Sequence, residues 1–148
     1  YSKMEFAYKQ PKHQDWFDVK VGNVRLTDVD IPGYFSTKEL HVGGLWINDV
    51  LLQNLKNRKI PVEPHIVPMI YEGLQKAPVR FKIDTASIAN FSVVYEELPV
   101  KGDKPGKLYF TDMNGQFSGL TNIVSYPEQF IRLHADGNLM GTPRGFII

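Results

Sequence analysis

A pattern of apolar residues that recurs three times constrains the fold of this chain more than any other feature. Each copy reads apolar-x-x-apolar-x-apolar-x-Asp/Asn-apolar-x-apolar, and the copies are Val21–Ile31, Val42–Leu52 and Ile83–Val93. Their starts are separated by nearly one and two units of a period of about 20 residues, which is typical of a repeat built from strand units. Amphipathic strands of similar length can also resemble one another by chance.

The apolar positions change parity within each copy. In the first copy the middle pair has even numbers and the flanking residues have odd numbers: Val24 and Leu26 against Val21, Val29 and Ile31. A flat strand would place these two sets on opposite faces. Either both faces are therefore buried, or the strand bends at each change of parity and keeps one apolar face.

The bends would fall at Gly22–Asn23 and again near Asp28. Bulges bend a strand and increase its twist, so bulges in register would curl the whole sheet into a trough or barrel wall. A tight hairpin turn at Gly22–Asn23 is the second interpretation, although it leaves very short strands.

The clearest single strand is Phe130–Met140, in which apolar and polar residues alternate. One parity carries Ile131, Leu133, Ala135, Gly137 and Leu139. Asp136–Asn138 could instead form a hairpin turn around its Asp-Gly pair, but the unbroken alternation favours a continuous strand.

One helix is predicted, from Pro68 to Lys76, because apolar residues recur there with helical spacing. The remaining segments read as a turn at Ile31–Tyr34, an extended linker at Asn57–Pro64 and a long hairpin loop at Leu98–Gly106.

These patterns predict a mainly β fold: a curved antiparallel sheet of long bulged strands, shaped as a groove or open barrel, with one short α-helix. No domain boundary is visible, so residues 1–148 form one domain or a fragment of a repeated β-groove protein. The chain begins Tyr-Ser-Lys, which we interpret as a piece of a longer protein.

The composition of the chain argues against some classes of partner and site. Lys and Arg number 17 and Asp and Glu number 16, giving a formal charge of +1, which argues against nucleic acid as the main partner. The absence of cysteine excludes a disulfide framework and thiolate metal sites.

Catalytic signals are weak. Glu96 and Glu97 are adjacent carboxylates, but neighbours in a strand point to opposite faces and cannot share a substrate. The histidines are isolated and lack the spacing of metal ligands: His13, His41, His65 and His134. We therefore expect no catalytic residue, no metal and no cofactor, with a carboxylate hydrolase as a minor alternative.

Four segments together carry a resemblance to a known family: Phe81–Glu97, Lys104–Asn114, Leu120–Asn122 and Leu133–Gly141. Their succession resembles the AsmA-like proteins of Bacteroidota, relatives of the large envelope proteins AsmA and TamB. The resemblance implies an inner-membrane anchor N-terminal to this segment and an extended β-groove in the periplasm that shelters acyl chains of phospholipids. It implies no catalytic residues, and it makes Tyr95, Glu96, Glu97, Thr121 and Asn122 structural markers. The predicted helix departs from the strand series of the family.

A lipid conduit needs a continuous apolar lining, because each methylene exposed to water costs about 0.8 kcal/mol. The lipid-facing candidates in the three copies are Val24, Leu26, Leu45, Ile47 and Ile88, or else their neighbours of opposite parity. The same residues could also fill a closed core.

The alternative function is that of a β-sandwich surface module that binds glycan or peptide. It would have two closed sheets and an exposed aromatic platform, for which Trp16 and Trp46 are candidates. We expect Phe91, Tyr95 and Phe117 in the core or in the lining of a trough.

Overall fold

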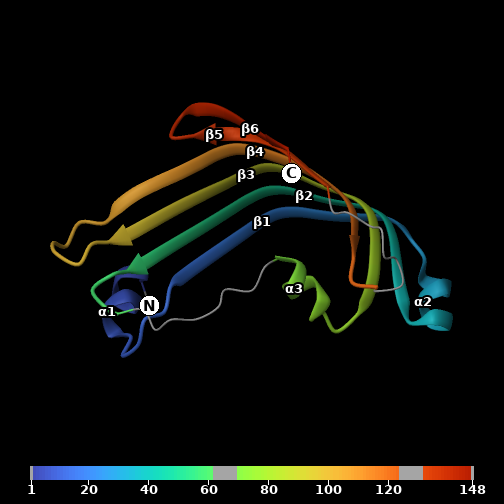
Figure 1. Cartoon of the computed structure of the whole chain (residues 1–148), viewed down its shortest axis with the longest axis horizontal. Helices are drawn as coiled ribbons and strands as arrows, with labels where there is room; N and C mark the ends of the chain where they lie inside the picture. The colour runs from blue at the N-terminus through green and yellow to red at the C-terminus, as the bar shows by residue number, and fades with distance from the viewer. Residues whose placement is uncertain (1, 62–69, 124–131, 148) are drawn as a thin grey trace.

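The computed structural model describes residues 2–61, 70–123 and 132–147, and their strands form a single arched sheet (Figure 1). The strands are β1 (Trp16–Val29), β2 (Glu39–Asn57), β3 (Arg80–Leu98), β4 (Gly106–Thr121), β5 (Arg132–Leu139) and β6 (Thr142–Ile147). Within the same ranges there are three short helices: α1 (Lys3–Lys9), α2 (Ile31–Thr37) and α3 (Ile70–Gln75).

The strands lie in the sheet in their order along the chain, from β1 to β6. Each neighbouring pair is antiparallel except β2 and β3, which are parallel. A parallel pair needs a crossover connection, and the chain between β2 and β3 supplies it with α3 in its course. The predicted mainly β, curved sheet is confirmed, and the parallel pair and the two further helices were not foreseen.

Two lines of bends cross the sheet and give it its curvature. The first passes through Gly22, Asp49, Asn90 and Asp112, and φ is 58°, 52° and 53° at the last three. The second passes through Asp28, Gly43, Asp84 and Gly119, and φ is 51° at Asp28 and 72° at Gly119. Asp and Asn adopt positive φ more readily than other side chains, which is why they occupy these positions. The bends predicted at Gly22–Asn23 and near Asp28 are confirmed, and β1 is continuous rather than a hairpin.

Glycine stands opposite aspartate where β1 and β2 bend together. A Cβ atom on Gly22 would lie 2.8 Å from Cβ of Asp49, and one on Gly43 would lie 2.8 Å from Cβ of Asp28. The register between the two strands runs unbroken through both bends. The two strands therefore bend as a pair, and the glycine makes room for the aspartate.

The first bend line reaches β5 as a true bulge. Thr111 pairs with Asn138 and Asn114 pairs with Asp136, so two residues of β4 oppose Gly137 alone. A Cβ atom on Gly137 would lie 3.0 Å from Cα of Met113. Only glycine fits at this position without moving the backbone of β4.

The first nine residues of the recurring pattern read the same in both directions. Its apolar residues stand at positions 1, 4, 6 and 9 of the copy and its bends at positions 2 and 8, as in Val21–Val29. The copy in β1 pairs with the copy in β2 in reverse order, because these strands are antiparallel. The copy in β3 pairs with the copy in β2 in the same order, because these strands are parallel. All three copies therefore lie at one level of the sheet.

A small buried core lies at one end of the strands. Ala7, Leu55 and Leu98 are its buried members, and Met4 and Trp16 pack against them. Helix α1 reaches this core, and its N-terminus carries a capping box in which the Ser2 side chain accepts from the Glu5 backbone N–H.

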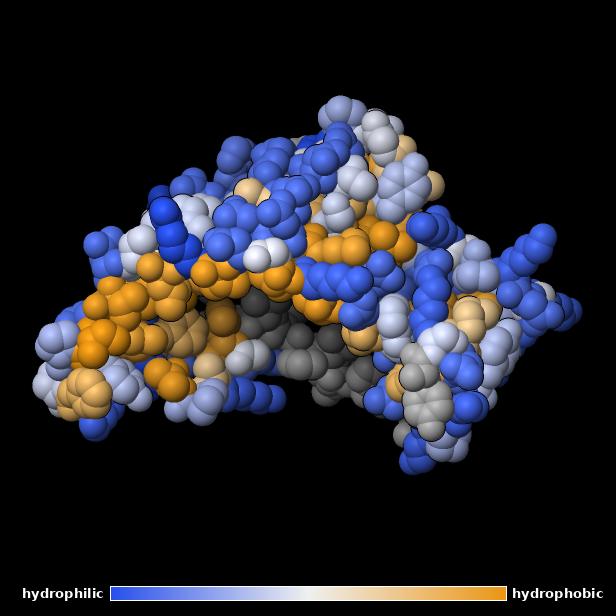
Figure 2. All heavy atoms as spheres, turned by 180° about the vertical axis from the view of Figure 1, so that it is seen from behind, coloured by the Kyte–Doolittle hydropathy of each residue, from blue (hydrophilic) through white to orange (hydrophobic). Residues whose placement is uncertain are grey.

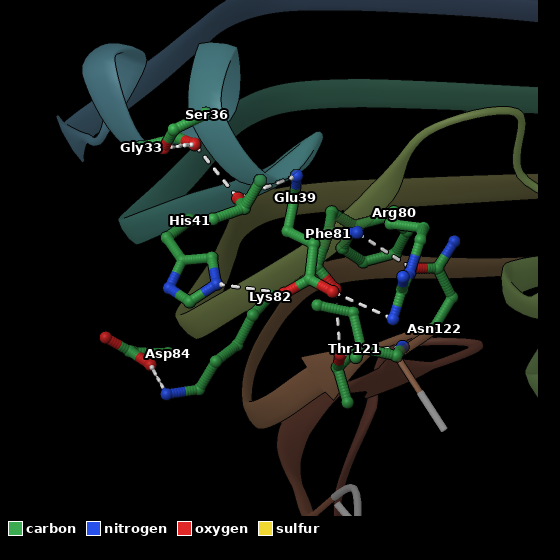
Figure 3. A network of polar contacts seen from close by, with 12 residues as sticks. Gly33, Ser36, Glu39, His41, Arg80, Phe81, Lys82, Asp84, Thr121 and Asn122 are labelled. Atoms are coloured by element: carbon green, nitrogen blue, oxygen red, sulfur yellow. Dashed lines mark hydrogen bonds and ion pairs between the residues drawn. The ribbon is translucent and has the colours of Figure 1, made fainter. Parts of the chain in front are cut away.

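A polar network closes the other end of the sheet, near α2 (Figure 3). The Thr121 hydroxyl donates to the Phe81 carbonyl oxygen at 2.7 Å, and the Phe81 N–H donates to the Asn122 side-chain oxygen at 2.7 Å. Arg80 forms an ion pair with Glu39 at 2.8 Å. The markers Thr121 and Asn122 thus join the end of β4 to the start of β3.

Several predicted connections are corrected by the structure. The turn expected at Ile31–Tyr34 is the start of α2, because the Asp30 side chain accepts from the Gly33 N–H at 2.8 Å and caps a helix with Pro32 in its first turn. The expected linker begins later than predicted, since β2 continues to Asn57.

Other predictions are confirmed over the described residues. The predicted helix is present as Ile70–Gln75, and β5 is one continuous strand with no turn at Asp136–Asn138. The hairpin between β3 and β4 has the expected long loop. Pro68, His65 and the first two residues of the Phe130–Met140 strand lie outside the described residues.

Candidate ligand-binding groove

The hollow side of the arch is apolar. Figure 2 shows hydrophobic side chains gathered along the inside of the bent sheet, whereas the outer side is mostly hydrophilic. Because directly paired residues point to the same face of a sheet, the strand register shows which residues make up this surface.

Four rows of residues cross the sheet on its hollow side, and we call this surface the groove. From β1 to β5 the rows are Val19–Leu52–Val93–Phe110–Leu139, Val21–Val50–Phe91–Met113–Gly137, Val24–Ile47–Ile88–Gly115–Ala135 and Leu26–Leu45–Ala86–Phe117–Leu133. Every row is apolar along its whole length from β1 to β5.

All five predicted lipid-facing residues lie in the groove. Val24, Ile47 and Ile88 are consecutive members of one row, and Leu26 and Leu45 are consecutive members of the next. Ile88 also lines the cavity described below, which shows that this row lies on the groove side of the sheet. The residues directly next to these five in sequence, such as Arg25 and Trp46, lie on the outer side, whereas the apolar residues of opposite parity beyond the first bend line, Val21, Val50 and Phe91, lie in the groove as well.

The groove is open along β1. Val24 is 58% exposed and Leu26 is 49% exposed, although their partners on β2 are half-buried. Val19 and Val21 continue the exposed stripe along the same strand. Contiguous exposed apolar surface of this kind is typical of interaction and ligand-binding sites.

The groove deepens into a cavity of about 190 Å³ between β3, β4 and β5. Its apolar lining includes Ile88, Phe91, Phe110, Met113, Phe117, Leu133 and Leu139. Apolar cavities of roughly 150 Å³ remain dry and take up small hydrocarbons, so this volume suits part of an alkyl chain.

Polar side chains form a chain of hydrogen bonds on the outer side of the first bend line. The Asn90 side-chain amide donates to Asp49 at 2.7 Å, and the Asn90 N–H donates to the Asn114 side chain at 3.2 Å. Asn114 in turn donates to Asp136 at 3.2 Å. At the first bend line the sheet is therefore polar on its outer face and apolar on its hollow face.

The two tryptophans do not form an aromatic platform in the groove. Trp16 packs against the small core, and Trp46 lies one residue before Ile47 and thus on the outer side. The Arg25 guanidinium lies 4.9 Å from the centre of the Trp46 ring.

The adjacent carboxylates are engaged in separate contacts. Glu96 is paired with Lys3, whereas Glu97 accepts from the Tyr95 hydroxyl at 2.7 Å and pairs with Arg58 at 2.9 Å. The hydrogen bond from Tyr95 and the charge of Arg58 lower the pKa of Glu97, while burial and this hydrogen bond raise the pKa of Tyr95 to about 12. An ionised, paired Glu97 is not arranged to donate a proton.

The histidines remain apart in the structure. His13 lies 3.5 Å from Asp15, and His41 lies 3.9 Å from Glu39. Over residues 2–61, 70–123 and 132–147, no group of three or more His, Cys, Asp or Glu side chains is placed to hold a metal ion.

Sequence reasoning missed part of the groove. Phe110 and Met113 differ in parity and share a face because of the bulge between them. The sequence signal for this bulge was Asp112, which precedes an apolar residue just as Asp28 and Asp49 do. Arg144, which also lines the cavity, was not singled out.

Comparisons of the chain with models of protein families, with curated proteins and with solved structures find no match. Among the helices of the described residues, none has both the length and the apolar character needed to cross a membrane.

Proposed function

We propose that this chain is a non-enzymatic segment of a periplasmic envelope protein of the AsmA-like type. In this proposal the groove holds acyl chains of phospholipids while they move between membranes or serve outer-membrane assembly. The parent protein is anchored in the inner membrane by a segment N-terminal to this chain.

The observation that carries the proposal is the continuity of the apolar rows across five strands. The rows lie on the hollow side of a bent sheet, include the exposed apolar stripe on β1, and line the cavity between β3 and β5. Burial of alkyl chains gains about 0.8 kcal/mol per methylene and requires no reactive group.

The alternative of a β-sandwich that binds glycan or peptide is less well supported. It requires two closed sheets, whereas the strands of the described residues form one open sheet. It also requires an aromatic platform, and both tryptophans are engaged elsewhere.

Titration with the neutral apolar dye N-phenyl-1-naphthylamine tests the proposal. We expect the wild-type chain to bind it with a rise in fluorescence. Ile88→Asp and Val24→Asp place a carboxylate in the groove, and each should weaken binding about tenfold or more, because a charge in an apolar site is costly to desolvate.

Matched controls lie next to these residues on the outer side of the sheet. Ala89→Asp and Asn23→Asp add the same side chain to the same strands and should leave dye binding unchanged. Equal losses in both pairs, or no dye binding by the wild type, would contradict the proposal.

The assignment to the envelope has its own test in the coding sequence on either side of this segment. An N-terminal membrane anchor followed by further strand units of the same pattern supports it. A flanking sequence that encodes a cytoplasmic enzyme contradicts it.

A further inference from the structure

The outer edge of β1 is open in the part of the chain that the structure describes. There β1 is the first strand of the sheet and pairs with β2 alone (Figure 1). It is 14 residues long and contains no proline. The strand at the opposite edge, β6, has only 6 residues and contains Pro143, which lacks an N–H for pairing. A long edge with free N–H and C=O groups is a template for a further strand.

Large exposed apolar side chains gather on the same strand. Val21, Val24 and Leu26 are 47%, 58% and 49% exposed, and Phe17 and Val19 are more than half exposed. A neighbouring strand with apolar residues at matching levels would remove part of this surface from water, which is favourable.

The bends of β1 limit which strand can pair with its open edge. Gly22 and Asp28 lie three residues before and three residues after Arg25. If two copies of β1 are antiparallel with Arg25 opposite Arg25, Gly22 of each copy faces Asp28 of the other. β1 and β2 meet in the same way, with Asp49 opposite Gly22 and Gly43 opposite Asp28. β1 is therefore complementary to itself at both bends.

This register also brings apolar residues together. Val24 falls opposite Leu26, and both are groove residues, while Val21 falls opposite Val29. Since paired residues share a face, the apolar rows would continue from one copy into the other. A shift of two residues would move Gly22 away from Asp28 and place each bend beside a straight part of the partner strand. The bends thus favour one register.

The charges of the edge are compatible with this register. Lys20 and Asp30 are exposed and fall opposite each other, which gives two favourable pairs about the axis. The ladder with β2 extends to Asp30, whose N–H donates to the His41 carbonyl oxygen at 3.0 Å and whose carboxylate also caps α2. Arg25 would face its own copy, but its guanidinium lies over the Trp46 ring on β2 and hence away from the open edge.

We propose that two copies of this chain associate by antiparallel pairing of residues 20–30, with a two-fold axis at Arg25. A closed dimer of identical surfaces has such an axis, and two edges related by it run antiparallel. The two sheets then form one continuous sheet with a continuous groove. The dimer follows from the edge and its bends, so it does not depend on the proposed function.

Cysteine cross-linking tests the axis. The sequence contains no cysteine, so Arg25→Cys provides one thiol per chain, which the axis places opposite itself. Directly opposed residues of antiparallel strands have Cα atoms about 4.5 or 5.5 Å apart, within the range of a disulfide. With oxidised glutathione we expect Arg25→Cys to form a linked dimer about tenfold faster than Val100→Cys or more. Val100 is exposed in a loop, and its variant measures linking by random collision.

Asn23→Cys and Thr27→Cys are the matched controls for the register. Both residues share the outer face with Arg25, and in the proposed dimer Asn23 of one copy faces Thr27 of the other. The two copies of Asn23 then lie roughly 13 Å apart, as do the two copies of Thr27. Each variant alone should link no faster than Val100→Cys, whereas a mixture of the two should form the mixed disulfide readily.

Sedimentation equilibrium measures the association without a cross-link. We expect the wild-type chain to form dimers reversibly as its concentration rises. Lys20→Glu places a like charge opposite Asp30 and should weaken the dimer about tenfold, whereas Arg25→Thr removes the like charges at the axis and should strengthen it several-fold.

Three results would overturn the inference. They are a wild-type chain that stays monomeric, an Arg25→Cys variant that links no faster than Val100→Cys, and an Asn23→Cys variant that links by itself as fast as Arg25→Cys. The cross-linking is repeated in the full gene product, because a strand encoded before residue 1 could occupy the same edge. If Arg25→Cys stays reduced there, the inference is wrong even if the isolated chain dimerises. Dye binding by the wild-type chain tests the groove separately from each of these results.

Discussion

At the scale of single residues, the bends depend on aspartate and asparagine in a conformation that most side chains avoid. Asp28, Asp49, Asn90 and Asp112 all have positive φ, which costs an ordinary residue roughly 1–2 kcal/mol. Their short polar side chains reduce this cost and also form the hydrogen bonds of the outer side, as Asn90 does with Asp49. The same residue type therefore sets both the shape and the polarity of the sheet.

Tyr95 gives the chain a predicted loss of stability at alkaline pH. Its pKa is about 12 in the folded chain, because burial and the hydrogen bond to Glu97 disfavour the phenolate, and its ordinary value is 10.0. The unfolded chain thus loses this proton first, so the contribution of Tyr95 is complete below pH 10 and is lost as the pH rises toward 12. Urea midpoints measured from pH 9 to pH 11.5 should fall less steeply in Tyr95→Phe than in the wild type. Identical slopes would show that Tyr95 does not titrate in this way.

At the scale of elements, β1, β2 and β3 keep their register through each bend because the partner strand bends at the same level, whereas the register shifts at the first bend line between β3 and β4 and between β4 and β5. Between β1 and β2 the match is a glycine opposite an aspartate, and between β4 and β5 it is a bulge opposite Gly137. A bend in one strand alone would break the hydrogen-bond ladder on both sides of it.

Gly137→Ala tests the bulge. The new methyl group would lie 3.0 Å from Cα of Met113, a backbone atom that cannot move without disturbing β4, so we expect a destabilisation of about 1–3 kcal/mol. Gly115→Ala is the matched control in the groove, because its Cβ would meet its nearest neighbour at 3.7 Å and should cost little. Chemical denaturation of the two variants compares them, and equal stabilities would contradict the close approach.

Alternation and the Asp/Asn positions were enough to predict the curvature and to put forward the five groove residues of β1 to β3 as candidates. They did not decide between these residues and their neighbours of opposite parity, because that choice depends on where each strand bends. The short helices were harder to predict because each is stabilised locally by its cap, as with Ser2 in α1 and Asp30 in α2, and has no long apolar period. The parallel pairing of β2 and β3 depends on the course of the crossover, which strand patterns do not encode. The place of Arg144 in the lining of the cavity was missed because it depends on the pairing of β6 with β5, a contact between strands.

At the scale of the whole molecule, the stabilising core and the groove are separate. Leu55 and Leu98 are fully buried at the end of the strands under α1, whereas the groove residues of β1 remain about half exposed. A protein that opens its apolar face to solvent must obtain its stability elsewhere, here from the long strand ladders and the small core.

Two leucine truncations distinguish this arrangement from a closed core. Leu98→Ala should destabilise the chain by about 2–5 kcal/mol, because the residue is fully buried. Leu26→Ala should cost about 1 kcal/mol or less, because half of its surface is already exposed. Thermal or urea unfolding measures both. A large loss for Leu26→Ala would indicate that the groove is packed like an interior.

The mirror symmetry of the recurring pattern has a consequence for how such a sheet can grow. In a strand with this pattern the apolar residues and the bends have the same spacing from either end. It can therefore pair with a further strand in either the parallel or the antiparallel direction, provided that the further strand has the same spacing. Duplication of one short stretch of coding sequence would therefore extend the wall by a strand without the need to specify its direction. The mixture of parallel and antiparallel partners around β2 shows both orientations side by side in one chain.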